Sequence, residues 1–453
     1  MRTPFYRFDK KTSVTIILIF TIITVIDSTI VKVVTFSGNE LPVATSVSIF
    51  ISFVAIFAFG GISLLTLLKK NVSTQINKKT SNTDHFLHLA YATLFLTTAI
   101  ALTAIIQMVF LNLYDLHFLI ISSLVTHVTA ILYLIFLIRI FIQWIRSRKN
   151  YIILLFMISI TFLCISMIVS VIYLEYIYSR SYSMERKPFP IHTFIIRQEV
   201  TSFSESLGTL FDFLYLSAFA TIWIATAILL YQYRYKLGKI RYFLLISLPL
   251  VYYSFTYLAY FGNLFSILIL DSPVGYGISY VLFFSATKQV GAFFFGITFL
   301  TASTIVKKDD VGKSLLITGI GIAILFGSLE ITTLQYRLYP PYGYITQSLL
   351  PLGAYLLFIG IFGSATKISR DAELRQEFHK TAMSQLSLLK TIGTRQMEVE
   401  LMKKFRTVEK RTHSMDSNQQ TLPEEEEVRQ IVREVLDEIR LHKINDKPRE
   451  SSS

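Results

Sequence analysis

The sequence predicts an all-α fold: a polytopic transmembrane bundle of about ten helical spans, followed by a cytoplasmic tail of amphipathic helices. Of the 453 residues, 53% are hydrophobic and only 16% are charged, which is too apolar for an ordinary soluble domain. Ten segments also reach the length of about 20 mostly apolar residues that a bilayer core requires. The bundle therefore takes up residues 1–366.

The ten predicted spans are separated by short polar connections whose charges alternate. The N-terminus and the connections after every second span carry 18 Lys and Arg residues, against 5 in the other connections. Short cytoplasmic loops are the ones enriched in Lys and Arg, so both termini are expected on the cytoplasmic side of the cell membrane. The predicted spans are 13–34, 46–68, 86–110, 118–144, 151–178, 207–231, 242–270, 279–306, 314–335 and 344–366.

The net charge of +13 does not indicate a nucleic-acid partner, because most basic residues lie in these short connections or share the tail with many acids. The lipid bilayer is the partner that the charge pattern predicts. A single cysteine, Cys164, excludes an intrachain disulfide and a cysteine-based metal site.

Two features divide the predicted bundle. The connection 179–206 is the one long external loop, and it is compatible with a lid, an interfacial segment or a solvated linker. The third to fifth spans contain no Gly or Pro, whereas the last three are rich in Gly. Because small residues let helix backbones approach closely in lipid, we expect the last three spans to pack most tightly.

Four charged residues lie at similar depths below the predicted external ends of their spans: Asp27, Asp212, Lys288 and Glu330. At 1.5 Å per residue their depths agree to within roughly 6 Å, about one helical turn. An isolated charge near the bilayer centre costs at least about 2.5 to 3.5 kcal/mol, so these groups are expected to face inward and to find partners. Consecutive, antiparallel spans make Lys288 and Glu330 the favoured pair.

Two uncharged polar residues, His127 and Asn263, reach comparable depths, which predicts a polar layer in the outer half of the bundle. Asp27 and Asp212 would then pair elsewhere, hold protons or meet a cation. Three interpretations stay open: a structural ion pair between neighbouring spans, a ligand or ion site, and a chance agreement of depths.

No motif indicates an enzyme, a cofactor or a metal. The stretch VGKS at 311–314 lacks the earlier glycine of a phosphate-binding loop, where Lys307 stands instead. His117 and His127 are ten residues apart, about 15 Å along a helix, which is too far for a shared metal. We therefore expect no catalytic set.

The tail is predicted to form two amphipathic helices, at 367–412 and 424–445, joined by a polar linker at 413–423. Such helices cannot bury their apolar stripes alone. They are expected to form a coiled coil in a homo-oligomer, to bind a cytoplasmic partner, or to lie on the membrane.

The stretch YPPYG at 339–343, the span that follows it, SRDAELR at 369–375 and IGTRQMEVE at 392–400 resemble multi-pass membrane proteins of ammonia-oxidising archaea that have no assigned function. The resemblance covers about the last 120 residues. It implies the same layout of a final span and a helical tail, and it transfers no site.

These features together predict a receptor-like or regulatory protein that senses an external small ligand, an ion or the state of the membrane, with a helical cytoplasmic output. The alternative is a secondary transporter that uses the intramembrane acids for proton or cation coupling.

Overall fold

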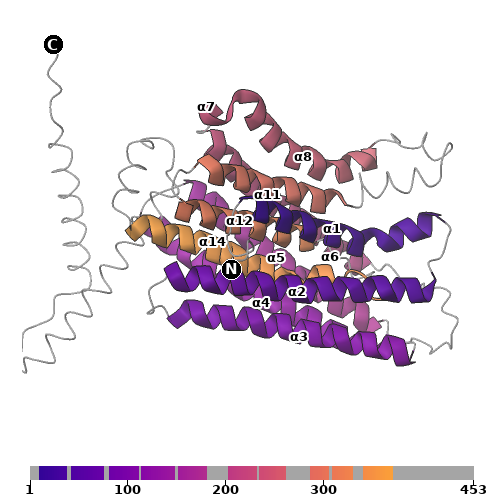
Figure 1. Ribbon diagram of the computed structural model, residues 1–453. Helices are drawn as coiled ribbons and strands as arrows, with labels where there is room; N and C mark the ends of the chain where they lie inside the picture. The colour runs from indigo at the N-terminus through magenta and orange to yellow at the C-terminus, as the bar shows by residue number, and fades with distance from the viewer. Residues whose placement is uncertain are drawn as a thin grey trace, which may run out of the picture.

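The computed structural model describes residues 10–37, 42–75, 81–111, 114–147, 151–180, 202–231, 234–261, 286–305, 309–329 and 340–370. The described residues are almost entirely helical, and each of the ten predicted spans coincides with a helix over much of its length (Figure 1). The helices are α1 (Lys10–Ser37), α2 (Val43–Gln75), α3 (Ser81–Leu111), α4 (Leu116–Ser147), α5 (Tyr151–Arg180), α6 (Ser202–Tyr231), α7 (Arg234–Leu237), α8 (Lys239–Phe261), α11 (Thr287–Ile305), α12 (Asp309–Ser328), α13 (Tyr344–Ser348) and α14 (Leu350–Arg370).

Seven helices in the described part of the chain are long and apolar enough to cross a membrane. They comprise α2 to α6, α12, and α13 together with α14. In α1 the apolar stretch that qualifies is shorter, Ser13–Ser28, and α8 and α11 do not meet the criterion over their described residues. The all-helical class is confirmed, whereas the count of ten spans stays a prediction.

The last two spans form the centre of the bundle. Helix α12 packs on α14, α11 and α1, and α14 also contacts α3 and α4 (Figure 1). Within the apolar windows of α12 and of α13–α14, 89% and 94% of the residues are buried in protein, against 33 to 56% in the other five candidate spans. These two spans are therefore enclosed by their neighbours.

Glycine makes this enclosure possible, as the sequence predicted for the last three spans. A Cβ on Gly321 of α12 would overlap the backbone nitrogen of Leu357 in α14, and one on Gly353 would lie 2.8 Å from the backbone nitrogen of Leu325. A Cβ on Gly296 of α11 would lie 2.9 Å from a backbone oxygen of α12. The backbones touch at these points, which is the packing expected where small residues line a helix interface.

The final span is interrupted near its predicted external end. Gly343, with a φ of 89°, precedes the five-residue helix α13, and a turn at Leu349 separates α13 from α14. Pro351 has no backbone N–H to donate to the carbonyl of Gln347, and its ring would clash with that carbonyl in a continuous helix. The regular helix is therefore interrupted just before Pro351. All five residues of α13 are buried.

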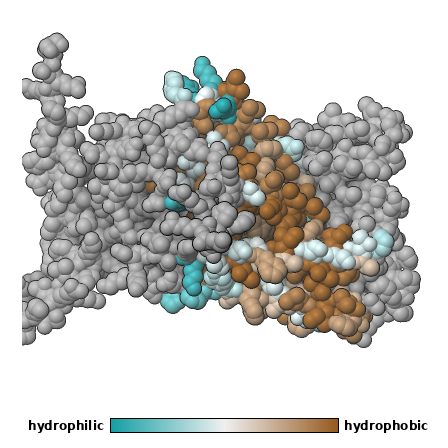
Figure 2. Space-filling view, viewed as in Figure 1, coloured by the Kyte–Doolittle hydropathy of each residue, from teal (hydrophilic) through white to brown (hydrophobic). Residues whose placement is uncertain are grey.

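The outer helices carry the apolar surface. Large side chains of α2 and α3 point away from the protein, including Phe59, Phe95 and Phe110, and Figure 2 shows a broad apolar surface over this side of the bundle. Hydrophilic surface appears in the same view at α7 (Figure 2). An exposed apolar belt is what a lipid-facing surface requires.

Candidate functional site

The stretch that contains α13 is the point where buried polar groups of the first four helices meet. The hydroxyl of Tyr342 donates to the carbonyl oxygen of Ser46 in α2 at 2.9 Å. The Tyr344 hydroxyl donates to the carbonyl oxygen of Thr97 in α3 at 2.8 Å, and it also lies 2.8 Å from the Ser122 hydroxyl of α4. Two tyrosines thus tie the start of the last span to three different helices.

Asp27 connects the same stretch to α1. Its side chain is fully buried, and its Oδ2 accepts hydrogen bonds from the Thr346 backbone N–H at 2.9 Å and the Thr346 hydroxyl at 2.7 Å. The carboxylate thereby satisfies a backbone N–H in the first turn of α13, where a helix has no partners of its own and favours negative charge. The prediction that Asp27 faces inward is confirmed.

His127 reaches α13 through the next residue along the chain. The Gln347 Nε2 donates to the Ser123 hydroxyl and lies 3.1 Å from the His127 Nδ1. That Nδ1 is also 2.9 Å from the Ser123 carbonyl oxygen. Because one ring nitrogen either donates or accepts, a proton on Nδ1 binds the carbonyl and leaves the Gln347 amide to the hydroxyl. His127 is therefore held by its own helix α4, and Gln347 binds α4 beside it at Ser123.

Lys288 does face the protein interior, but its described partner differs from the one expected. Its Nζ lies 3.3 Å from the Asp212 Oδ1 of α6 and 5.3 Å from the centre of the Tyr215 ring. The Asp212 side chain is 54% exposed, so the prediction that it would face inward is wrong. The side chain of Phe213 beside it is exposed as well, since this face of α6 is turned outward, and the long lysine stem spans the distance from the buried α11.

Two predicted members of the polar layer, Glu330 and Asn263, lie outside the described residues, as do most of the long external loop and the tail beyond residue 370. The pairing of Lys288 with Glu330 therefore stays a prediction.

A fourth polar contact joins α1 to α11. The Gln289 Nε2 donates to the Ser28 hydroxyl at 3.1 Å, and that hydroxyl donates to the Val25 carbonyl oxygen at 3.2 Å. Gln289 also lies against α12, because a Cβ on Gly327 would be 4.0 Å from its Cα. Asp27 and its neighbour Ser28 thus place α1 at the junction of α11, α12 and α13.

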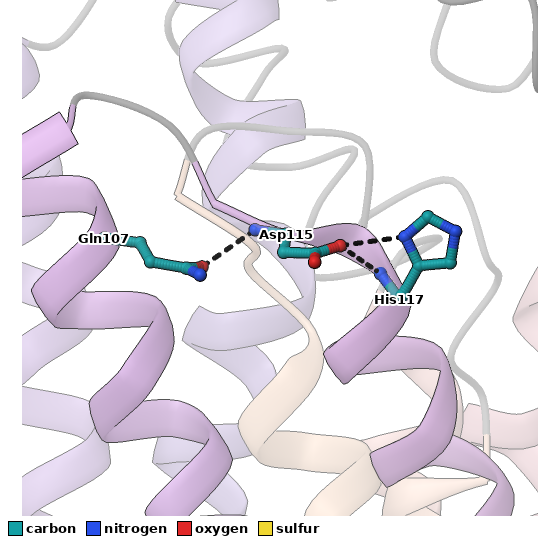
Figure 3. Close-up of polar contacts among 3 residues, drawn as sticks. All are labelled: Gln107, Asp115 and His117. Carbon is teal, nitrogen blue, oxygen red and sulfur yellow. Dashed lines mark hydrogen bonds and ion pairs between the residues drawn. The ribbon is translucent and has the colours of Figure 1, made fainter.

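The clearest polar cluster at the surface lies between α3 and α4 (Figure 3). The Asp115 Oδ1 accepts hydrogen bonds from the His117 backbone N–H at 2.9 Å and lies 2.8 Å from the His117 Nδ1, while the Asp115 N–H donates to the Gln107 Oε1 at 2.8 Å. This is a helix N-cap at the start of α4. No cluster of three His, Cys, Asp or Glu side chains suited to a metal occurs among the residues that the structure describes.

The residues of α13 escaped the sequence interpretation, which ranked charged groups by depth and passed over neutral ones. A signal was present in TQS at 346–348, three consecutive polar residues near the start of an apolar span, two residues after the stretch YPPYG. Neutral polar residues are common at span ends, so only their partners mark them as a junction.

Comparison of the chain with protein-family models, with characterised proteins and with solved structures finds no match in any of the three.

Proposed function

We propose that the protein is an integral membrane sensor or receptor-like regulator in which α13 and α14 carry the state of the outer half of the bundle to the cytoplasmic tail. The seven apolar helices are compatible with an integral membrane protein. The proposal includes four further points: both termini are cytoplasmic, the protein is not an enzyme, the tail forms a coiled coil, and the chain is similar to archaeal membrane proteins.

One observation carries the proposal: the stretch from Tyr342 to Gln347 makes side-chain hydrogen bonds to each of α1, α2, α3 and α4, and it lies in the last span before the tail. A movement of those helices relative to one another would therefore change the hydrogen bonds of α13 directly. Buried polar contacts of this kind have discrete arrangements, so they suit a two-state element better than a continuously deformable one.

The break at Leu349 gives this element a mechanical basis. Since Pro351 removes a helical hydrogen bond at the boundary, α13 can tilt with respect to α14 at a lower cost than within a continuous helix. Helix α14 itself is held on α12 by backbone contact at Gly353. A movement of α13 would be passed to α14 as a rotation or a small shift, and from α14 to the predicted amphipathic helix at 367–412.

Hydrogen exchange of the full-length protein in lipid nanodiscs tests this coupling without a known ligand. Thr346→Val removes the hydroxyl that binds Asp27, and we expect faster exchange in α13 together with altered exchange in residues 371–412. Thr103→Val is the matched control, because Thr103 is exposed on α3 and bonds only its own helix at the Ala99 carbonyl. Faster exchange in α13 with an unchanged tail would refute the sensor.

A secondary transporter is the second candidate, and one observation favours it. The Asp27 Oδ1 is buried and accepts no hydrogen bond from the described residues. Buried intramembrane acids of this kind commonly mark proton or cation pathways. Proteoliposomes with the chain truncated after Lys367 separate the two candidates: a transporter retains a proton or Na⁺ flux that Asp27→Asn abolishes, whereas a sensor shows no such flux in either form.

A further inference from the structure

Three buried oxygen atoms around α1 have no hydrogen-bond partner among the described residues: the Asp27 Oδ1, the Gln289 Oε1 and the Ser328 Oγ. The first two can only accept. A buried acceptor without a donor costs about 1 to 3 kcal/mol, and more for a charged group. Oxygen atoms of this kind are the ligands that a hard cation takes.

The contacts of Gln289 place it beside the chain neighbours of the other two residues. Gln289 binds Ser28, the residue next to Asp27, and it also lies against Gly327, the residue next to Ser328. The orientation of its amide follows from chemistry: the Ser28 hydroxyl donates its proton to Val25, so the Gln289 atom that faces it must be the donor Nε2. The carbonyl Oε1 is then turned away from Ser28.

Ser328 is buried near the end of α12, and its neighbours one and two turns earlier show which face of the helix carries it. It stands seven residues after Gly321 and three after Leu325, so the three residues share one face of α12. That face packs on α14, since Gly321 meets Leu357 and Leu325 meets Gly353. The end of α12 at Ser328 therefore reaches the level of α13, with which α12 is in contact and where Thr346 holds Asp27.

No basic side chain of the described residues pairs with Asp27. The nearby lysine, Lys288, is directed to Asp212 on α6. One carboxylate among neutral amide and hydroxyl oxygens gives a site of charge −1, and hard oxygen ligands suit alkali and alkaline-earth cations. A monovalent ion neutralises that charge, whereas a divalent ion would leave a buried excess of +1.

We propose that Asp27, Gln289 and Ser328 bind a monovalent cation, Na⁺ or K⁺, at the junction of α1, α11, α12 and α13. This inference rests on the proposed function in that it assigns a ligand to the same junction. The cation would draw the ends of α1, α11 and α12 together beside Thr346, so its release would loosen the hold of α1 on α13.

Thermal unfolding of the full chain in detergent tests the site, followed by the fluorescence of its two tryptophans. NaCl or KCl replaces choline chloride at constant ionic strength. We expect the unfolding midpoint of the wild type to rise and saturate with Na⁺ or K⁺, as binding to the folded state alone requires. Asp27→Asn should remove the rise, and Asp115→Asn, a change in the exposed loop, should keep it.

Ser328→Ala decides the matter if Asp27→Asn does not fold, because the Ser328 hydroxyl has no described partner to lose. Its apparent cation affinity should fall by about tenfold or more, the loss expected for one contact to an ion. Ser48→Ala, on the exposed face of α2, is the matched control and should bind as the wild type does.

Four results would overturn the inference: an equal midpoint in choline, a rise that persists in both Asp27→Asn and Ser328→Ala, a rise with Mg²⁺ or Ca²⁺ alone, and a response to pH alone. The last would assign a proton to Asp27. The outcome is separable from that of the proposed function, since a protein that binds Na⁺ while its tail ignores Thr346→Val would keep the cation site and lose the sensor.

Discussion

The centre of the bundle and its outer layer use the same apolar residue types but hold them in different ways. In α12 and α14 the backbones touch at glycines, and buried hydroxyl, amide and carboxylate groups meet at α13. In α2 and α3 most residues of each span are not buried, and large side chains are directed outward. Lipid gives little drive for helices to associate, so the centre depends on shape and hydrogen bonding. Changes there should cost far more than similar changes outside.

The largest contrast is expected at glycine. In Gly321→Ala the new methyl group meets the backbone of α14, which cannot move aside as a side chain can. We expect a loss of about 3 kcal/mol or more in the free energy of unfolding, at the upper end of the cost of overpacking. Gly208→Ala in α6 is the control: its Cβ would have no atom within 4 Å, so the higher helix propensity of Ala should leave stability unchanged or slightly higher. Equal losses in denaturant titrations would remove the distinction between centre and outer layer.

A tyrosine hydroxyl tests the polar part of the centre. Tyr344→Phe should lower the free energy of unfolding by about 1 to 3 kcal/mol. It removes the hydrogen bond to Thr97 and leaves the buried Ser122 hydroxyl without the tyrosine hydroxyl as its partner. Tyr235→Phe, on a side chain that is 83% exposed, should change stability by less than about 0.5 kcal/mol. The two variants are compared in the same unfolding titration, and a Tyr344→Phe protein as stable as the Tyr235→Phe one would contradict the role of α13.

The cap of α4 should have an intermediate effect. Asp115→Ala removes the acceptor for the His117 N–H and should cost about 1 kcal/mol, the usual value for a lost N-cap. Asp115→Asn should recover most of the loss, because Asn caps as well. Hydrogen exchange in the first turn of α4 locates the effect, and exchange that is unchanged in the Ala variant would show that this contact does not hold the helix end.

The ion pair of Lys288 with Asp212 should contribute less to stability than the burial of the lysine suggests. Lys288→Met keeps the apolar stem and leaves Asp212 half exposed, where water can solvate it. We expect a loss below about 1 kcal/mol, typical of exposed ion pairs. A loss of several kcal/mol would indicate a second buried acid beside Lys288, as the predicted pair with Glu330 would supply.

The smallest effect is expected from pH at the α3–α4 loop. Burial acts to raise the pKa of the Asp115 carboxyl, but the hydrogen bonds and the charge of His117 outweigh it, and the pKa lies below its ordinary value. A carboxyl with a lowered pKa stabilises the fold above its unfolded pKa and loses that contribution as the pH falls through the folded one. Below about pH 4 this contribution should be lost, so the thermal midpoint of the wild type should approach that of Asp115→Asn. The corresponding change in the free energy of unfolding should be less than about 0.5 kcal/mol after solvent screening. A difference in thermal midpoint between the two proteins that widens on acidification would contradict this prediction.

Position along a helix could be predicted from the sequence, whereas rotation about its axis could not. Hydropathy located each helical segment, and counting from span ends placed Asp27, Lys288 and His127 among groups that prove to be buried. The same counting failed for Asp212, whose depth is similar but whose face of α6 points outward. A rotation of about 100° per residue separates inside from outside, and packing against other helices sets it.

Partners were harder to predict than burial. The tight packing of the last three spans followed from their glycines, because small residues act locally. The link from Asp27 to Thr346 joins residues 319 positions apart and depends on a short, broken helix that hydropathy treats as part of one span. Lys288 was assigned to the next helix in sequence, which is a fair default for a hairpin, yet α11 also packs on α1 and α8 and approaches α6 through its side chains.

The central claim is that the contact of Asp27 with Thr346 links the outer half of the bundle to the tail. A double-mutant cycle tests this claim most directly. Tail hydrogen exchange in residues 371–412 is measured in nanodiscs for Asp27→Asn, Thr346→Val and the double variant. If both residues act through one contact, the double variant should change the tail no more than the larger single change. Effects that add in full would mean that the two residues reach the tail independently, and the proposed coupling through α13 would be wrong.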